Sequence, residues 1–261
     1  MLRSVAQASE WVAAHPDEND WAEQATRWVP WLAAFAVLAL VLRALTQAQR
    51  YRAVGVLTEA DIEALHEEVR QAERRTVGEI VPVVVERSDD HPHAGLAAAL
   101  LFALGGAALL AAHLPWHAPE QVLLAQFGLA LAGWTLCRCV PGFARLFVGE
   151  ARATHVAAEQ ALQEFAQLDL RSTAAESGVL IFVSLFERRV VVLGDRGVDA
   201  RVGSEHWKAI DAAVRAGVRR GSLRTGLIDG IRLAGLVLAE HFPSADGERN
   251  ELPDRVVVRA R

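Results

Sequence analysis

The strongest constraint on the fold is an apolar hairpin that the sequence predicts at 178–198, GVLIFVSLFERRVVVLGDRGV. Residues 179–185 are almost unbroken in apolar side chains, which indicates a strand that is buried on both faces. The charged run 186–189 reverses the chain, and an apolar return strand ends at a Gly-Asp-Arg-Gly turn. Because so hydrophobic a hairpin is not stable alone in water, the rest of the chain must cover it.

Long apolar runs predict segments that span a membrane. Apolar residues make up 52% of the chain, and the mean hydropathy is positive at +0.19. Three runs have about the length that a helix needs to cross a bilayer: 29–46, 94–114 and 121–140. A short Pro-containing link joins the second and third, so we expect a transmembrane helical hairpin. The first run is short for a span, and a buried or interfacial helix is the alternative.

The remaining sequence divides into an N-terminal arm, two halves of one domain and a tail. Residues 1–28 are acidic and spotted with tryptophan. The soluble segments 57–93 and 150–245 are separated by the hairpin, and the first is too small to bury a core of its own. Residues 246–261 form a charged tail, in which 256–258 are expected to add a short strand. We therefore expect one interrupted domain.

Helix and strand signals fill in the two halves. Thr58, with Asp61 three residues later, marks the start of a helix at 58–75. A strand follows at 79–86, and Pro82 within it favours an edge position or a strand start. In the second half, apolar periodicity predicts helices at 150–168, 204–217 and 225–241. The buried side of the first of these is expected to carry Val156, Leu162, Phe165 and Leu168.

The distribution of arginine predicts the orientation in the membrane. The connection between the first and second runs contains six arginines, and further arginines follow the third run at 138, 145 and 152. The short link between the second and third runs has none. By the positive-inside rule, we expect the N-terminus outside and both halves of the domain in the cytoplasm.

Composition and motifs argue against several classes of function. A formal charge of −5 does not favour nucleic acid as a partner. Cys137 and Cys139 lie one residue apart in an apolar run, which is typical of small residues in a membrane helix rather than of a disulfide framework. The sequence also has no Walker loop, no Cys-x5-Arg phosphate loop and no His-Glu-x-x-His motif. Three spans without a buried acid or base pair make a transporter a poor reading.

Several blocks together resemble the TPM domain. They are LTEADIEALHEEVRQAERRTVGEIVPVVVE at 57–86, the hairpin, and GSLRTGLIDGIRLAGLVLAEHFP at 221–243. The chain is most similar to bacterial membrane versions in which a transmembrane hairpin interrupts the domain, and NELPDR at 250–255 also resembles that subgroup. The resemblance covers roughly 57–93 and 150–255. It implies an α/β fold with a small mixed β-sheet sandwiched by helices, at a bacterial inner membrane.

The resemblance leaves the function open among several classes. Some members of the family are metal-dependent phosphatases, others bind calcium, and others bind membrane proteins. Bacterial TPM domains often accompany LemA-type membrane proteins, which makes such a protein a candidate partner. We expect an inner-membrane protein whose cytoplasmic domain binds other membrane proteins in assembly or quality control. The alternative is a weak divalent-metal-dependent phosphatase.

Carboxylates near the strand ends are the candidates for that alternative. Asp195 lies in the Gly-Asp-Arg-Gly turn and Asp199 follows four residues later, while Glu79 begins the first strand. Carboxylate oxygens suit Ca²⁺ or Mg²⁺, so these three are the predicted metal ligands. Glu79 could equally lie at the opposite edge, and such a turn needs no ligand. Asp89 is a further, weaker candidate, and His206 could serve as an acid or base or be purely structural.

Overall fold

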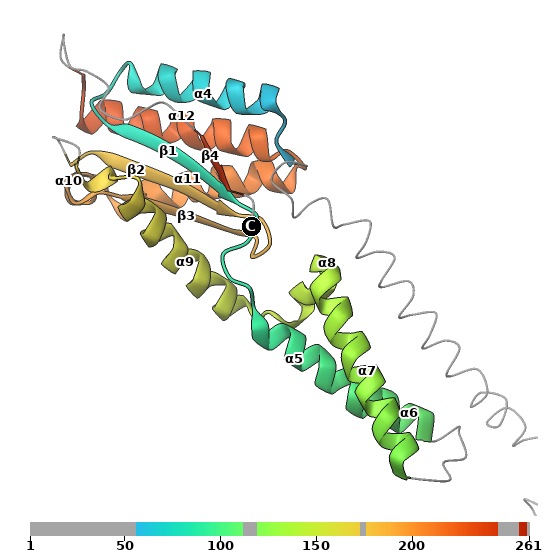
Figure 1. Ribbon diagram of the computed structural model, residues 1–261. Helices are drawn as coiled ribbons and strands as arrows, with labels where there is room; N and C mark the ends of the chain where they lie inside the picture. The colour runs from blue at the N-terminus through green and yellow to red at the C-terminus, as the bar shows by residue number, and fades with distance from the viewer. Residues whose placement is uncertain (1–55, 112–118, 173–175, 245–255, 260–261) are drawn as a thin grey trace, which may run out of the picture.

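A four-stranded mixed sheet forms the centre of the computed structural model, which describes residues 56–111, 119–172, 176–244 and 256–259 (Figure 1). The strand order is β3-β2-β1-β4. β1 pairs in parallel with both β2 and β4, whereas β3 is antiparallel to β2. The strands are β1 (Glu79–Val85), β2 (Gly178–Ser184), β3 (Arg189–Gly194) and β4 (Val257–Arg259). The expected α/β class with a small mixed sheet is confirmed.

Helices cover both faces of this sheet. One face packs against α4 (Glu59–Glu73), α11 (Ser204–Arg219) and α12 (Leu223–His241), and the other packs against α9 (Glu150–Gln167) (Figure 1). Every residue of β1 and β2 is buried. Alternate side chains of β2 point to the two layers, so that Ile181 lies in the core under α11 and α12 and Phe182 in the core under α9. The apolar run of β2 is uninterrupted because its side chains are buried on both faces of the sheet.

Two sequence expectations for the sheet and its helices were wrong. Pro82 lies within a central strand and not at an edge or a strand start. It is tolerated because, in the described residues, β4 pairs only with the last three residues of β1, so that side of the strand is unpaired at Pro82. Leu162 is 51% exposed, although its neighbours Val156 and Phe165 are buried as expected.

The other helix predictions are confirmed. Thr58 and Asp61 form a capping box at the start of α4, with the side chain of each bonded to the backbone N–H of the other. The helices expected at 150–168, 204–217 and 225–241 are α9, α11 and α12. The strand expected at 256–258 is β4, and a short helix that the sequence did not predict, α10 (Arg196–Arg201), follows β3.

The connection from β1 to β2 contains two long apolar helical segments. The first consists of α5 (Pro92–Leu101), a π-helical turn η3 (Phe102–Gly106) and α6 (Ala107–Ala111), and the second is α7 (Pro119–Cys139). Both are long and apolar enough to cross a membrane, over Pro92–Leu109 and Pro119–Cys139. They extend away from the sheet as a hairpin (Figure 1). Crossing of a membrane stays a prediction, and the expected span at 29–46, the arm 1–28 and residues 245–255 lie outside the described part.

Glycines bring α11 and α12 into close contact. A Cβ atom on Gly217 would lie 2.2 Å from the Cα atom of Gly226, and one on Gly230 would lie 2.5 Å from Cγ2 of Val214. Real Cβ atoms do not approach other heavy atoms so closely. The spacing of glycines in α12 thus serves the packing of helices and does not require a ligand.

We therefore expect Gly217→Ala to lower the free energy of unfolding by about 1–3 kcal/mol, because the two helix backbones would have to separate. Urea unfolding of the detergent-purified protein, followed by tryptophan fluorescence, measures this change. Gly128→Ala is the matched control, since a Cβ atom there meets no atom within 4 Å. Equal stability of the Gly217 variant and the control would contradict the account of this contact.

Candidate functional site

The predicted metal ligands lie at one end of the sheet. The strand register aligns Glu79 with Gly178 and Val179 with Gly194, and Asp195 follows immediately after β3. Glu79 is therefore at the same end as Asp195, two strands away, and not at the opposite edge. Asp199 lies one turn further along, in α10. The structure thus brings Asp195 and Asp199 together and leaves Glu79 separated from them by β2.

The two aspartates have different surroundings. Asp195 is the N-cap of α10, where its Oδ1 accepts a hydrogen bond of 2.8 Å from the backbone N–H of Arg196. Its Oδ2 is buried and has no hydrogen-bond partner among the described residues. Partial burial raises the pKa of Asp199, and the negative charge of Asp195 raises it further, against a hydrogen bond from Trp207 that lowers it. The pair is thus a local concentration of negative charge.

This pair does not amount to a metal site of the usual composition. In the ranges that the structure describes, no group of three or more His, Cys, Asp or Glu side chains is arranged to hold a metal ion. Calcium normally takes six to eight oxygen ligands, of which two carboxylates supply a minority. Binding of Ca²⁺ or Mg²⁺ by Asp195, Asp199 and Glu79 stays a prediction.

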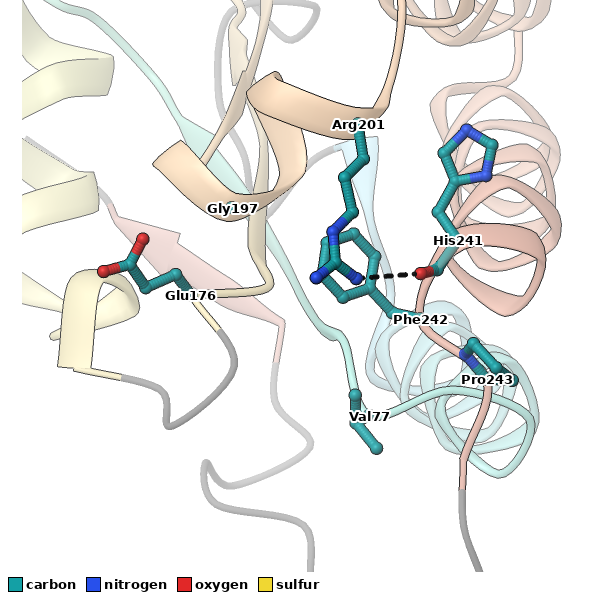
Figure 2. Close-up of a pocket in the computed structure, with 7 residues that line it drawn as sticks. All are labelled: Val77, Glu176, Gly197, Arg201, His241, Phe242 and Pro243. Atoms are coloured by element: carbon teal, nitrogen blue, oxygen red, sulfur yellow. Dashed lines mark hydrogen bonds between the residues drawn. The ribbon is translucent and has the colours of Figure 1, made fainter.

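A pocket of about 530 Å³ opens at the same end of the domain (Figure 2). The guanidinium of Arg201 lies 4.6 Å from the ring centroid of Phe242 and donates a hydrogen bond of 3.3 Å to the carbonyl oxygen of His241. Figure 2 shows Glu176 across the pocket from Arg201. The imidazole of His206 is a neighbour of His241, at 6.1 Å between ring centroids. The pocket therefore combines a fixed cation, imidazole and an apolar ring.

Sequence reasoning did not find this pocket because its lining comes from separate segments. The segments before β1 and before β2, the helix α10 and the end of α12 each contribute one to three residues. The full lining is Val77, Glu176, Gly197, Arg201, His241, Phe242 and Pro243. The sequence carries one sign of it, the His-Phe-Pro run that ends α12, but nothing local indicates that α10 faces that run.

A second polar cluster is buried at the opposite end of the sheet, where the helical hairpin begins. Glu187 in the β2–β3 turn is fully buried, and its Oε1 lies 2.7 Å from Nε2 of His91, which is 3% exposed. Its Oε2 accepts hydrogen bonds from the hydroxyl of Ser184 and, at 3.0 Å, from the backbone N–H of Ser88. Burial raises the pKa of Glu187, but these hydrogen bonds outweigh burial and hold it below the ordinary value.

His91 extends this cluster to the hairpin and to α9. Its Nδ1 lies 3.7 Å from Oδ2 of Asp89, and that oxygen accepts a hydrogen bond of 2.7 Å from Arg152 in α9. His91 has a positive φ of 47° and immediately precedes Pro92, the first residue of α5. The cluster therefore joins the end of β1, the β2–β3 turn, α9 and the start of the hairpin. It also places Asp89 far from Asp195.

The sequence did not indicate this cluster. Glu187 stands in a run that looked like an ordinary charged turn, and its partner His91 lies 96 residues away in sequence. One signal was present: Glu187 comes directly after Leu185 and Phe186, which continue the apolar run of the preceding strand. The arrangement orients the hairpin. The Ser184 hydroxyl is bound to the carboxylate and not to the imidazole, so it is not an activated nucleophile.

We expect Glu187→Gln to lower the free energy of unfolding at pH 7 by about 1–3 kcal/mol, since the amide loses charge-assisted hydrogen bonds in a buried site. The wild-type pKa is depressed, so its stabilisation is present above the ordinary Glu value near 4.5 and lost as the pH falls through the lower folded value. The difference between the two proteins should therefore shrink on acidification. Urea unfolding from pH 7 to pH 3.5 measures it.

Glu205→Gln is the control for this prediction, because Glu205 is exposed and forms an ion pair of 2.8 Å with Lys208 along the same helix. Its effect should be small at every pH in this range. A Glu187 variant as stable as the control at pH 7 would show that the buried cluster is not the junction that we describe.

Comparison with known proteins supports the fold. No family model matches the chain, and no curated protein matches it. Among solved structures, it is similar to the NMR structure of the BA42 protein from the psychrophilic bacterium Bizionia argentinensis, with a TM-score of 0.50 and 20% sequence identity. The match covers 78% of this chain and 95% of BA42. At this identity the likeness concerns the fold alone, and it supports the TPM-like fold that the sequence resemblance implies.

Proposed function

We propose that this protein is an inner-membrane protein whose α/β domain is held at the cytoplasmic surface by its helical hairpin and binds another membrane protein during assembly or quality control. The observation that carries the proposal is the hairpin itself. It is inserted between two neighbouring strands of the sheet, and most of its large apolar side chains are exposed. If the hairpin is in a membrane, the domain is anchored there through the connection between its two central strands.

The dimensions and surface of the hairpin suit a bilayer. Helical segments of 18 and 21 residues correspond to lengths of roughly 27 and 32 Å, close to the hydrocarbon thickness of a membrane. So much exposed apolar surface is rare on a soluble monomer. The side chains that are 45–71% exposed on these helices are Leu96, Leu100, Leu101, Leu104, Leu109, Leu123, Leu124, Phe127, Leu131 and Trp134.

A buried cluster fixes the hairpin to the domain. Phe186 in the β2–β3 turn packs with Ala94 and Ala98 of α5, and with Cys137 and Val140 at the end of α7. Together with the His91–Glu187 contact, this packing sets the orientation of the sheet relative to the hairpin, and so to the proposed membrane. The pocket and the aspartate pair are at the far end of the sheet, so they face away from the bilayer in this arrangement.

The partner is proposed to contact that far end. The pocket offers a guanidinium that Phe242 orients and, across from it, the carboxylate of Glu176, which suits a peptide segment that carries charges of both signs. A LemA-type membrane protein is the partner that the sequence resemblance implies. The orientation with the N-terminus outside rests on the arginines that flank the hairpin.

A photo-reactive amino acid in place of Gly197 tests this proposal in intact membranes. We expect a discrete crosslinked product with one membrane protein, and we expect Arg201→Glu to reduce it at least tenfold. The same amino acid at Gln163, an exposed position on α9, is the control and should give no such product. Products that are the same at both positions, or that survive Arg201→Glu, would argue against a binding site in the pocket.

The second candidate is a weak metal-dependent phosphatase, and the buried, unpaired Oδ2 of Asp195 is the observation in its favour. It predicts turnover of a generic phosphoester by the detergent-purified protein that requires Mg²⁺ or Ca²⁺, stops with chelator and is abolished by Asp195→Asn. Asp211→Asn, which changes a partly exposed ion pair with Arg215, is the control. Activity that is equal in the two variants would dismiss this candidate.

A further inference from the structure

Two arginines at the base of the helical hairpin differ from their neighbours in having aromatic rings as partners instead of carboxylates. Arg145 and Arg189 both bind Glu150, and Arg152 binds Asp89. By contrast, neither Arg87 nor Arg138 has a carboxylate oxygen within 4 Å in the described part of the chain. Arg87 is half-buried, so its charge is not simply a solvated surface charge.

Each of the two guanidiniums lies against an aromatic ring. The guanidinium carbon of Arg87 is 4.5 Å from the ring centroid of Phe186, and that of Arg138 is 5.9 Å from the ring of Trp134. A cation–π contact uses no N–H donor of the guanidinium, so these groups can still bind an anion. Those groups form the planar fork that binds phosphate oxygens in pairs.

The two arginines lie at one place in the fold. The ring of Phe186, against which Arg87 lies, belongs to the same buried cluster as Cys137 in the last turn of α7. Arg138 is the next residue along α7. Both cations therefore flank the last turn of α7, where the hairpin meets the domain.

This place is the border between the apolar and polar surfaces of the molecule. Leu131 and Trp134 are the last large apolar side chains exposed on α7, at 52% and 45%, and Arg138 follows one turn later. One turn of helix is about 5 Å, so the guanidinium is at the depth of lipid headgroups if the apolar surface is in the hydrocarbon. The anion that is abundant at that depth is the phosphodiester of a phospholipid.

We infer that Arg87 and Arg138 form a binding site for the phosphodiester of an anionic phospholipid. The inference rests on the proposed insertion of the hairpin in a membrane, and it adds a specific lipid contact at the junction. Arg87 is on the loop after β1 and Arg138 is on α7, so one headgroup bound there would connect the domain to the end of the hairpin. The lipid would thereby help to hold the sheet at the bilayer surface.

Native mass spectrometry of the full-length protein, purified in neutral detergent, tests the site with phosphatidylglycerol and phosphatidylcholine. We expect preferential adducts with phosphatidylglycerol. Each arginine contributes about fivefold to binding of an anionic lipid, so Arg87→Gln/Arg138→Gln should weaken these adducts by roughly 25-fold. Arg196→Gln/Arg219→Gln removes the same charge from exposed positions of α10 and α11 and should leave them unchanged.

Two further experiments distinguish a lipid headgroup from free phosphate, and lipid binding from membrane insertion. Inorganic phosphate at 20 mM should not displace the lipid, and displacement would mean a site for a free anion instead. Equal adducts with both lipids, or adducts that persist in the Arg87/Arg138 variant, would overturn the inference. Flotation with neutral phosphatidylcholine liposomes reports insertion alone. If all variants float but the preference for phosphatidylglycerol is missing, only this inference fails. If no variant floats, the membrane proposal fails.

Discussion

The structure depends on the parallel pairing of β1 with β2. Both strands are buried along their whole length, so each needs the other as a neighbour and a helix layer on each face. Parallel neighbours cannot be joined by a tight turn, because the chain must return to the same end of the sheet. That return is the segment 86–177, and it contains the helical hairpin as well as α9. The crossover that this pairing requires therefore carries the hairpin as well as α9.

This connectivity gives the two ends of the sheet different roles. At the end where β1 leaves the sheet, the buried carboxylate of Glu187 is hydrogen-bonded, and its contact with His91 links the start of α5 to the β2–β3 turn. At the other end, Asp195 leaves one carboxylate oxygen without a partner in the described residues, and a pocket opens beside α10. This difference between the two ends is what the proposed role as a membrane-bound binding domain would use.

The parts of the fold that sequence predicted are those with local causes. The continuous apolar run of β2, the capping box of Thr58 and Asp61, and the periodicity of α11 and α12 are each visible within a few residues. The prediction for Pro82 was wrong because a proline in this central strand is tolerated only where β4 does not pair with it, and β4 is far away in the sequence.

The candidate sites were less predictable for the same reason. The sequence singled out Asp195 and Asp199 as candidates four residues apart, and the helix that brings them together, α10, was not predicted. The sequence did not predict the pocket or the contact between His91 and Glu187, which are assembled from distant segments. A buried carboxylate in a charged turn looks like any other charge until its partner is known. Tertiary packing, and not local propensity, decides these positions.

The most direct test of the central claim is the environment of the hairpin in a bilayer. Spin labels at Leu100, Phe127 and Gln163, in a protein with Cys137→Ala and Cys139→Ser, can be compared in liposomes for accessibility to oxygen and to a water-soluble nickel complex. The account predicts that the labels at 100 and 127 meet oxygen and exclude nickel, and that the label at 163 does the reverse. Nickel accessibility at all three positions would show that the hairpin does not lie in the membrane.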